Sequence, residues 1–138
     1  MTMDRYVLEA LQKKAITAVG VSVPLKCVGI AFQPPVSGRW WEIIWIPNNP
    51  TGETWDSAQT YRGMFRLVLH TPIDGKGAYS ILDEVNRVAA NFSKGTKLAD
   101  SGNNVVVLLV ENPEFIGLFE TTPESEAFLS IRYTCFKP

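Results

Sequence analysis

The sequence contains few of the residues that catalysis and metal binding require. Its 138 residues include one histidine, His70, and two cysteines, Cys27 and Cys135. A nucleophilic enzyme pairs its nucleophile with a base, but His70 follows an apolar segment directly, a position typical of surface or capping residues. The cysteines lie in apolar, strand-like segments and lack the short spacings of zinc sites. We therefore expect no catalytic residue, no metal, no cofactor and no disulfide.

The sequence also lacks an excess of charge and any long hydrophobic run. Its formal net charge is -1, so no overall field attracts nucleic acid or an anionic membrane. Residues 1–14 mix charged and apolar side chains, which argues against a signal peptide or a spanning helix there. We expect a cytoplasmic protein that binds neither nucleic acid nor membrane. Its length and its 46% hydrophobic content fit a single domain over residues 1–138.

A Gly-Lys-Gly turn ending at Gly77 resembles the end of a phosphate-binding loop. Such a loop has the spacing G-x-x-x-x-G-K-[ST]. Here the first glycine position is His70 and the hydroxyl position is Gly77, so the match fails at both. The turn is better explained as a tight strand-to-helix connection in which glycine permits positive φ. The alternative is that Asp74 and Lys76 contact another subunit at the start of the helix.

Two segments have the apolar periodicity of amphipathic helices. The first covers residues 2–19, and the second starts after the Gly-Lys-Gly turn and ends near Gly95. The apolar stripes comprise Val7, Leu8, Leu11, Ala15 and Ala18 in the first helix, and Ile81, Leu82, Val85, Val88, Ala89 and Phe92 in the second.

Five segments are predicted to be strands. Residues 27–32 form the first, which Pro34 and Pro35 end, and it makes an antiparallel hairpin with residues 39–47. Residues 61–70 alternate between an apolar face and a wet face with Arg62, Arg66 and His70. Residues 105–110 are β-branched on both faces, as in a central strand. Residues 127–136 turn inward the side chains of Leu129, Ile131, Tyr133 and Cys135.

These elements predict an α+β fold with a mainly antiparallel sheet of about five strands and two helices packed on one face. The tryptophans of residues 39–47 make both faces of that strand largely apolar. The second face of the sheet is therefore covered either by another subunit or by loops of the same chain. Two long polar segments, residues 48–60 and 111–126, are expected to be mobile or functional loops, and the carboxylates of the second are expected to be solvated.

The order of these features resembles a known family. The motifs on which the resemblance rests are an F-x-P-P turn, a Trp-rich strand ending in P-N-x-P, a G-x-F-x-L-x-V-like strand, a P-x-x-G-x-G turn into a helix, F-x-x-G-T after that helix, and a final S-I-R-Y strand. Together they span nearly the whole chain. They are similar to the tail-terminator-like minor tail proteins of long-tailed bacteriophages and prophages. His70 and Thr71, before the turn, replace a position that is usually apolar.

The resemblance implies a structural protein of the virion tail that assembles in the bacterial host cytoplasm. It implies a homo-oligomeric ring, typically of six copies, that caps the tail tube and contacts tail-tube and head-completion proteins. Alternatives are a head-to-tail joining protein and a small α+β ligand-binding or enzyme domain. A ring joins two different patches of each subunit, and the candidate interface residues are Trp40, Trp41, Trp45, Asn48, Asn49, Trp55, Asp74 and Lys76.

We predict that the Gly75 to Gly77 turn binds no nucleotide, because the first glycine and the hydroxyl of a phosphate loop are missing. Titration calorimetry with ATP or GTP and magnesium should give no heat of binding. Micromolar affinity would contradict the prediction.

Overall fold

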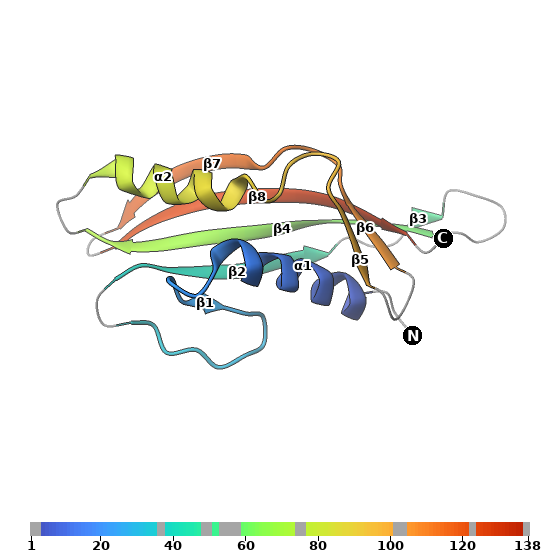
Figure 1. The fold of residues 1–138 in the computed structure, drawn as a ribbon, viewed down its shortest axis with the longest axis horizontal. Coiled ribbons are helices and arrows are strands. Elements are labelled where there is room, and N and C mark those ends of the chain that lie inside the picture. Colours follow the sequence, from blue (N-terminus) through green and yellow to red (C-terminus); the bar gives the residue numbers. More distant parts are fainter. Residues whose placement is uncertain are drawn as a thin grey trace.

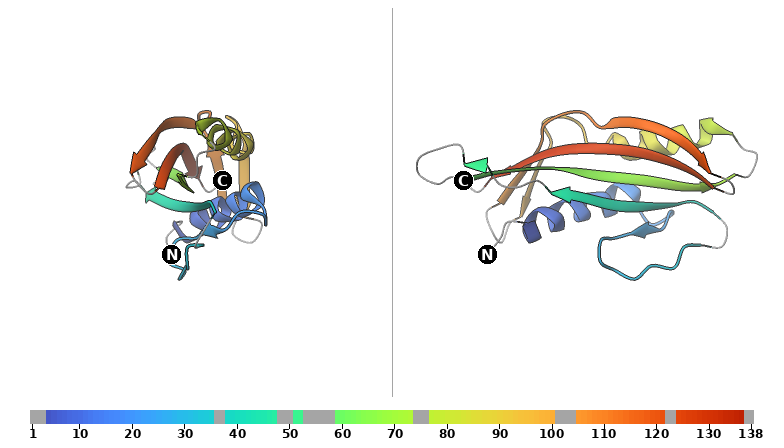
Figure 2. Two further views of the ribbon diagram at one scale, coloured as in Figure 1. Left: turned by 90° about the vertical axis from the view of Figure 1, so that its left-hand side faces the viewer. Right: turned by 180° about the vertical axis from the view of Figure 1, so that it is seen from behind.

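The computed structural model describes residues 4–35, 38–47, 51–52, 59–73, 77–100, 105–121 and 124–136, and these form an elongated α+β structure (Figure 1). Two helices, α1 (Asp4–Val19) and α2 (Ala78–Ala89), pack on the same face of one sheet. Seen along its length, the sheet curls around the layer of helices (Figure 2). Neither helix is long and apolar enough to cross a membrane, judged over the described residues.

The described part of the sheet has eight strands in the order β1-β2-β4-β8-β6-β5, with β3 beside β4 and β7 beside β8. Every pairing is antiparallel except that of β1 with β2. The predicted mainly antiparallel α+β fold is thus confirmed, although the sheet has more strands than five. The strands are β1 (Leu25–Lys26), β2 (Trp40–Pro47), β3 (Thr51–Gly52), β4 (Gln59–Pro72), β5 (Lys97–Asp100), β6 (Val105–Leu109), β7 (Glu114–Thr121) and β8 (Glu124–Phe136).

Both helices contribute the apolar stripe that their periodicity predicts. The buried residues of α1 recur every three or four positions, and α1 ends where Gly20 adopts a positive φ of 79° and donates its N–H to the Ile16 carbonyl. Helix α2 starts directly after Gly77, whose φ is 78°, so the glycine supplies the backbone conformation that the turn needs. The buried stripes are Val7, Leu11, Ala15 and Ala18 of α1, and Ile81, Val85 and Val88 of α2.

The three long strands β2, β4 and β8 supply most of the sheet's core. Alternate residues point toward the helices, as the period of two requires, and the apolar face predicted for β4 and the inward residues predicted for β8 are confirmed. The predicted central strand β6 also lies between two others, β5 and β8. The fully or nearly fully buried side chains include Trp41, Ile43, Phe65, Leu67, Leu69, Leu129, Ile131, Tyr133 and Cys135.

The predicted strand at residues 27–32 and its antiparallel hairpin are wrong. Only Leu25–Lys26 forms a strand, and it runs parallel to β2. Backbone donors beyond it are used elsewhere, because the Val28 N–H donates to the Gln12 side chain of α1 and the Ile30 N–H donates to the Cys27 carbonyl. Gly29, with a φ of 74°, completes the turn.

The predicted loop at residues 111–126 is also wrong, since most of it forms β7 and the start of β8. Its centre holds the aromatic and branched residues Phe115, Ile116, Leu118 and Phe119, which favour a strand, and its glutamates stand at the two ends. The other predicted loop, residues 48–60, lies largely outside the described residues; within it, Thr51–Gly52 pairs with the beginning of β4.

Gly63 of β4 is a point of close contact between three strands. It lies opposite Pro47 of β2 and Tyr133 of β8. A Cβ atom at this position would be 2.5 Å from the Tyr133 hydroxyl oxygen and 2.9 Å from the Ile46 carbonyl oxygen. That hydroxyl also accepts a hydrogen bond of 2.7 Å from the indole N–H of Trp45, so the tyrosine is held in place over the glycine.

We predict that Gly63→Ala lowers the free energy of unfolding by about 1–3 kcal/mol, because the added methyl group overpacks this contact. Denaturant titration followed by tryptophan fluorescence measures the change. Tyr133→Phe removes the oxygen nearest to the added methyl group. The double variant should therefore lose less stability than the sum of the losses in the two single variants. Unchanged stability of Gly63→Ala would contradict the close packing.

Candidate interaction surface

Strand β7 forms an open edge of the sheet. It pairs with β8 along Glu114–Thr121, and no strand pairs with its other side in the described part of the chain. A register shift between Phe115 and Gly117 marks a bulge at Ile116. An open edge presents unpaired backbone groups to other chains, so β7 is a candidate contact surface.

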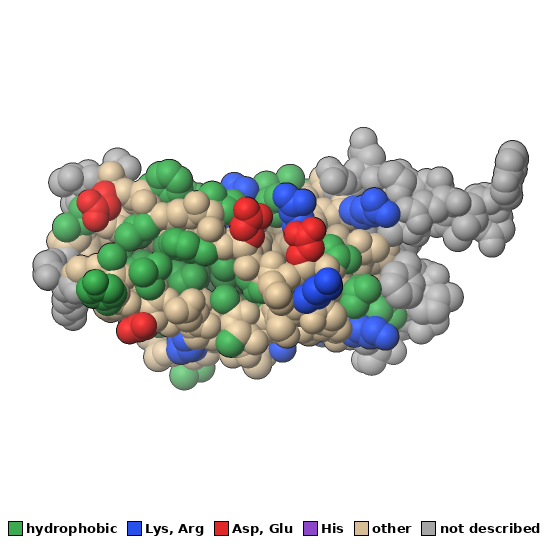
Figure 3. Space-filling view, turned by 90° about the horizontal axis from the view of Figure 1, so that it is seen from above, with side chains coloured by type: hydrophobic (Ala, Val, Ile, Leu, Met, Phe, Trp, Pro, Cys, Tyr) green, Lys and Arg blue, Asp and Glu red, His purple; other side chains and the backbone are tan. Residues whose placement is uncertain are grey.

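The side chains of β7 are apolar and exposed. Phe115, Ile116 and Phe119 have exposed fractions of 42%, 44% and 51%, and Phe119 packs edge-on against the half-buried Phe128 of β8 with ring centres 5.4 Å apart. We call these four residues the β7 patch. Viewed from the side of β7 and α2, hydrophobic side chains gather in the left half of the surface among a few charged ones, and most Lys and Arg side chains lie in the right half (Figure 3). Exposed apolar patches of this kind mark contact sites.

The structure separates the three tryptophans of β2 that were expected at an interface. Trp41 is fully buried in the subunit's own core, so it is not accessible to another subunit, and this expectation is corrected. Trp40 and Trp45 are half-buried. Trp40 stacks on the His70 ring at 3.9 Å and contacts Phe32 at 5.1 Å between ring centres, which leaves its outer surface available. The other expected residues, Asn48, Asn49, Trp55, Asp74 and Lys76, lie outside the described residues.

His70 is not the surface residue that the sequence suggested. It is 8% exposed on the sheet face opposite the helices, where Trp40 covers its ring. Its Nε2 atom is 2.9 Å from a carboxylate oxygen of Glu42, and its Nδ1 atom contacts the Glu124 carboxylate. Val68 on the same face is also buried, so the face expected to be wet is partly covered at this end by its own side chains.

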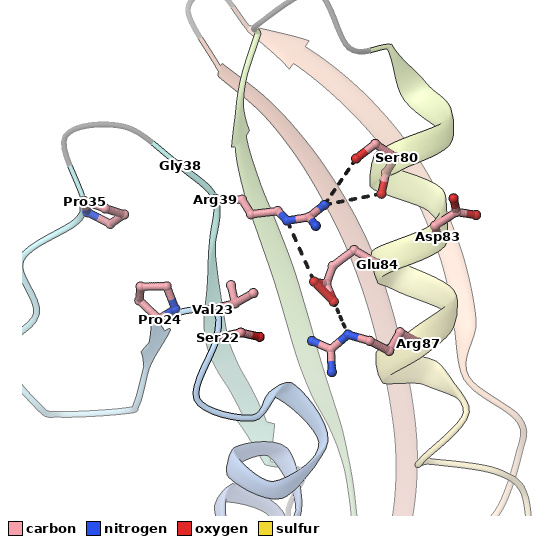
Figure 4. Close-up of a pocket in the computed structure, with 10 residues that line it drawn as sticks. All are labelled: Ser22, Val23, Pro24, Pro35, Gly38, Arg39, Ser80, Asp83, Glu84 and Arg87. Carbon is pink, nitrogen blue, oxygen red and sulfur yellow. Dashed lines mark hydrogen bonds and ion pairs between the residues drawn. The ribbon is translucent and has the colours of Figure 1, made fainter.

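An open pocket of about 680 Å³ lies where α2 approaches the start of β2 and the loop after α1. At its base the buried carboxylate of Glu84 faces two arginines (Figure 4). It accepts a 2.5 Å hydrogen bond from Arg87 and lies 3.8 Å from Arg39. Arg39 also donates to the Ser80 carbonyl at 3.3 Å.

Arg87 extends this network to the end of α1. Its two terminal nitrogens donate to the Ala18 and Val19 carbonyls at 3.0 and 2.9 Å, which are among the carbonyls that a helix end leaves unpaired. The pocket wall therefore joins α1, β2 and α2 through one buried carboxylate. Because the charges pair with one another, we assign this network to stability rather than to ligand binding.

Cys27 and Cys135 are not joined in a disulfide. Cys135 is buried on β8, while Cys27 is half-buried after β1. Burial raises the pKa of the Cys27 thiol, which disfavours the reactive thiolate at neutral pH. His70, the single histidine of the sequence, contacts carboxylates and Trp40.

The fold and this surface define a small α+β protein whose curled sheet ends in an open, apolar edge strand. A family model described as phage tail terminator protein matches residues 6–133, and the chain belongs to that family. A solved structure that is 20% identical in sequence has a TM-score of 0.80 and covers 100% of this chain and 99% of that chain, which shows a shared fold. No curated protein matches the sequence. The family assigns the protein a structural role in phage tails.

Sequence reasoning missed the β7 patch because glutamates and threonines were given more weight than the apolar residues between them. The segment EFIGLFET carries the signal, since four of its eight residues are Phe, Ile or Leu. With a one-residue bulge the segment fits a strand in which Phe115 lies opposite Leu129 of the core face and Phe119 lies opposite Glu126 of the other face. Its exposed apolar residues therefore lie on both faces of the edge strand. The burial pattern itself depends on where β8 begins, which the sequence does not indicate.

We predict that Glu84→Gln lowers the free energy of unfolding by about 1–3 kcal/mol, because two arginines lose their buried charged acceptor. Thermal and denaturant unfolding measure the loss. The matched control is Asp83→Asn, which removes an exposed carboxylate from the same pocket wall and should change stability by less than about 0.5 kcal/mol. Equal effects of the two variants would contradict the structural role of Glu84.

Proposed function

We propose that the protein caps the phage tail tube as a ring of identical subunits and joins the tube to the head side. Membership of the tail terminator family supports a tail role, and the β7 patch is the observation that supports assembly through this chain's own surface. The resemblance in sequence implies that such a ring typically has six copies.

The β7 edge suits a contact with another copy. Its apolar centre is bounded by Glu114 and Glu120, and such flanking charges limit unspecific edge-to-edge pairing. A partner that covers the centre and leaves the ends in water would bury Phe115, Ile116 and Phe119 without burying a charge. Contacts of this composition favour a specific neighbour over general aggregation.

A closed ring needs a second patch that receives the first. For this patch we retain the segment of residues 48–60 with Asn48, Asn49 and Trp55, the Asp74 and Lys76 turn, and the outer surface of Trp40. Each contact is then repeated around the ring. Repetition lets weak single contacts add up to firm attachment at the end of the tube, because the later contacts form at high effective concentration.

Tube-length measurements test this function. The cognate tube protein is polymerised with its length-setting partner, with and without this chain, and tube lengths are measured by electron microscopy. Capping predicts that omission gives overlong tubes that fail to join heads. Normal lengths with failed joining would favour the head-to-tail joining alternative, and normal tubes that still join heads would exclude both tail roles.

Variants of the β7 patch test whether this surface is needed for capping in the tube-length assay. We predict that Ile116→Asp with Phe119→Asp raises the concentration needed for capping at least about tenfold, because a charge must be buried in each repeated contact. The control is Val21→Asp, a fully exposed apolar residue beyond the end of α1, which should cap normally. Replacement of residues 48–60 by a Gly-Ser linker should also weaken capping. Circular dichroism checks that each variant folds, and normal capping by the β7 variant would contradict its role.

A further inference from the structure

One end of the sheet face opposite the helices gathers a histidine and three glutamates from three strands. This end lies where β2 and β8 begin and β4 ends, at the left of Figure 1. In the ladder, His70 pairs with Trp40 on one side and with Glu126 on the other. Glu42 lies two residues after Trp40 on β2, and Glu124 lies two residues before Glu126 on β8, so the period of two places them on the same face.

The two nitrogens of His70 face different carboxylates. Nε2 is 2.9 Å from Glu42, whereas Nδ1 contacts Glu124 and is 3.7 Å from a carboxylate oxygen of Glu126. Glu42 also accepts a hydrogen bond of 3.3 Å from Lys26. When Nε2 donates its N–H to Glu42, Nδ1 is the ring nitrogen that can bind a metal ion, and it faces Glu124 and Glu126.

The ring itself is held rigidly. Its side chain is 10% exposed, and Trp40 stacks on it with an interplanar angle of 10°. A rigid imidazole whose distal N–H donates to a carboxylate is the usual arrangement around a metal-bound histidine, because it orients the ring and makes the ligating nitrogen more basic.

Nδ1 contacts Glu124, but Glu126 at 3.7 Å is beyond hydrogen-bond distance. One N–H at Nδ1 can therefore serve only one of the two carboxylates, whereas a cation can contact both. A divalent ion between the three groups neutralises both carboxylates at once, and the three ligand atoms already lie within 4.8 Å of one another.

We propose that Nδ1 of His70 and the carboxylates of Glu124 and Glu126 form a divalent-cation site of the zinc type. Imidazole with carboxylate suits zinc and similar transition ions rather than the all-oxygen preference of magnesium. Ligand atoms of a tetrahedral zinc site are about 3.3 Å apart, so the present spacing needs only small side-chain rotations. Three protein ligands leave a fourth position for water, and the bound ion holds β4 to β8 where the two strands meet the turns.

Zinc titration of the untagged, chelator-treated protein tests the site. Calorimetry at pH 7.5 should show one ion per chain with micromolar affinity or tighter, and zinc should raise the unfolding temperature. His70 is the only histidine, so a long-range proton–nitrogen spectrum contains one imidazole. Its Nδ1 signal should shift on zinc addition far more than its Nε2 signal. Millimolar magnesium should not reproduce the shift.

Single-atom variants identify the ligands. Glu126→Gln and Glu124→Gln should each weaken zinc binding at least about tenfold, and Glu42→Gln should weaken it about tenfold through the histidine. Glu114→Gln removes an exposed carboxylate from β7, a neighbouring strand of the same sheet, and should leave affinity unchanged.

Three results would overturn the proposal: no binding below about 100 µM, zinc affinity that is the same in Glu126→Gln and Glu114→Gln, or a zinc-dependent shift confined to Nε2. Because Glu126 is partly exposed, its variant is expected to fold even where His70→Gln does not. The test measures the ion alone, so its outcome is independent of ring formation.

Discussion

The structure depends on the unequal lengths of the strands that pair with β8. Along one edge of β8, β4 pairs continuously from Pro72 opposite Glu124 to Tyr61 opposite Cys135. Along the other edge, no single strand is long enough: β7 pairs with the first half and β6 with the end. The shared edge lets the sheet curl around both helices, and it also makes β7 an outer strand. The same constraint therefore creates the core and the open apolar edge.

The sequence predicted the elements whose burial follows a simple period. Helices α1 and α2 and strands β2, β4 and β8 each bury alternate or helically spaced residues against one layer, and this pattern is local. It failed at residues 27–32, after β1. There the Val28 N–H donates to the Gln12 side chain and the Ile30 N–H donates to the Cys27 carbonyl, so neither joins a strand. It failed again at β7, whose bulge breaks the period of two and whose apolar residues Phe115 and Phe119 are exposed on opposite faces of the sheet. Both failures depend on contacts with distant segments.

The histidine cluster was beyond sequence reasoning for a related reason. Spacing rules for metal sites search for ligands close together in the chain, but Glu124 follows His70 by 54 residues and the register of β4 with β8 brings them together. Glu124 and Glu126 had been assigned to a solvated loop because β8 was expected to begin later. Once the strand begins at Glu124, the period of two places both carboxylates on the face of His70.

The two faces of the sheet consequently differ in composition and burial. The helix-side face is packed with apolar residues and fixed by the Glu84 network and by Tyr133 over Gly63, so changes there alter stability first. The opposite face and the β7 edge hold half-buried Trp40, the charged cluster around His70 and the exposed rings of Phe115 and Phe119. These residues contribute little to the hydrophobic core between sheet and helices. Residues of the outer face and of the β7 edge can therefore change with less effect on the fold than residues of the core.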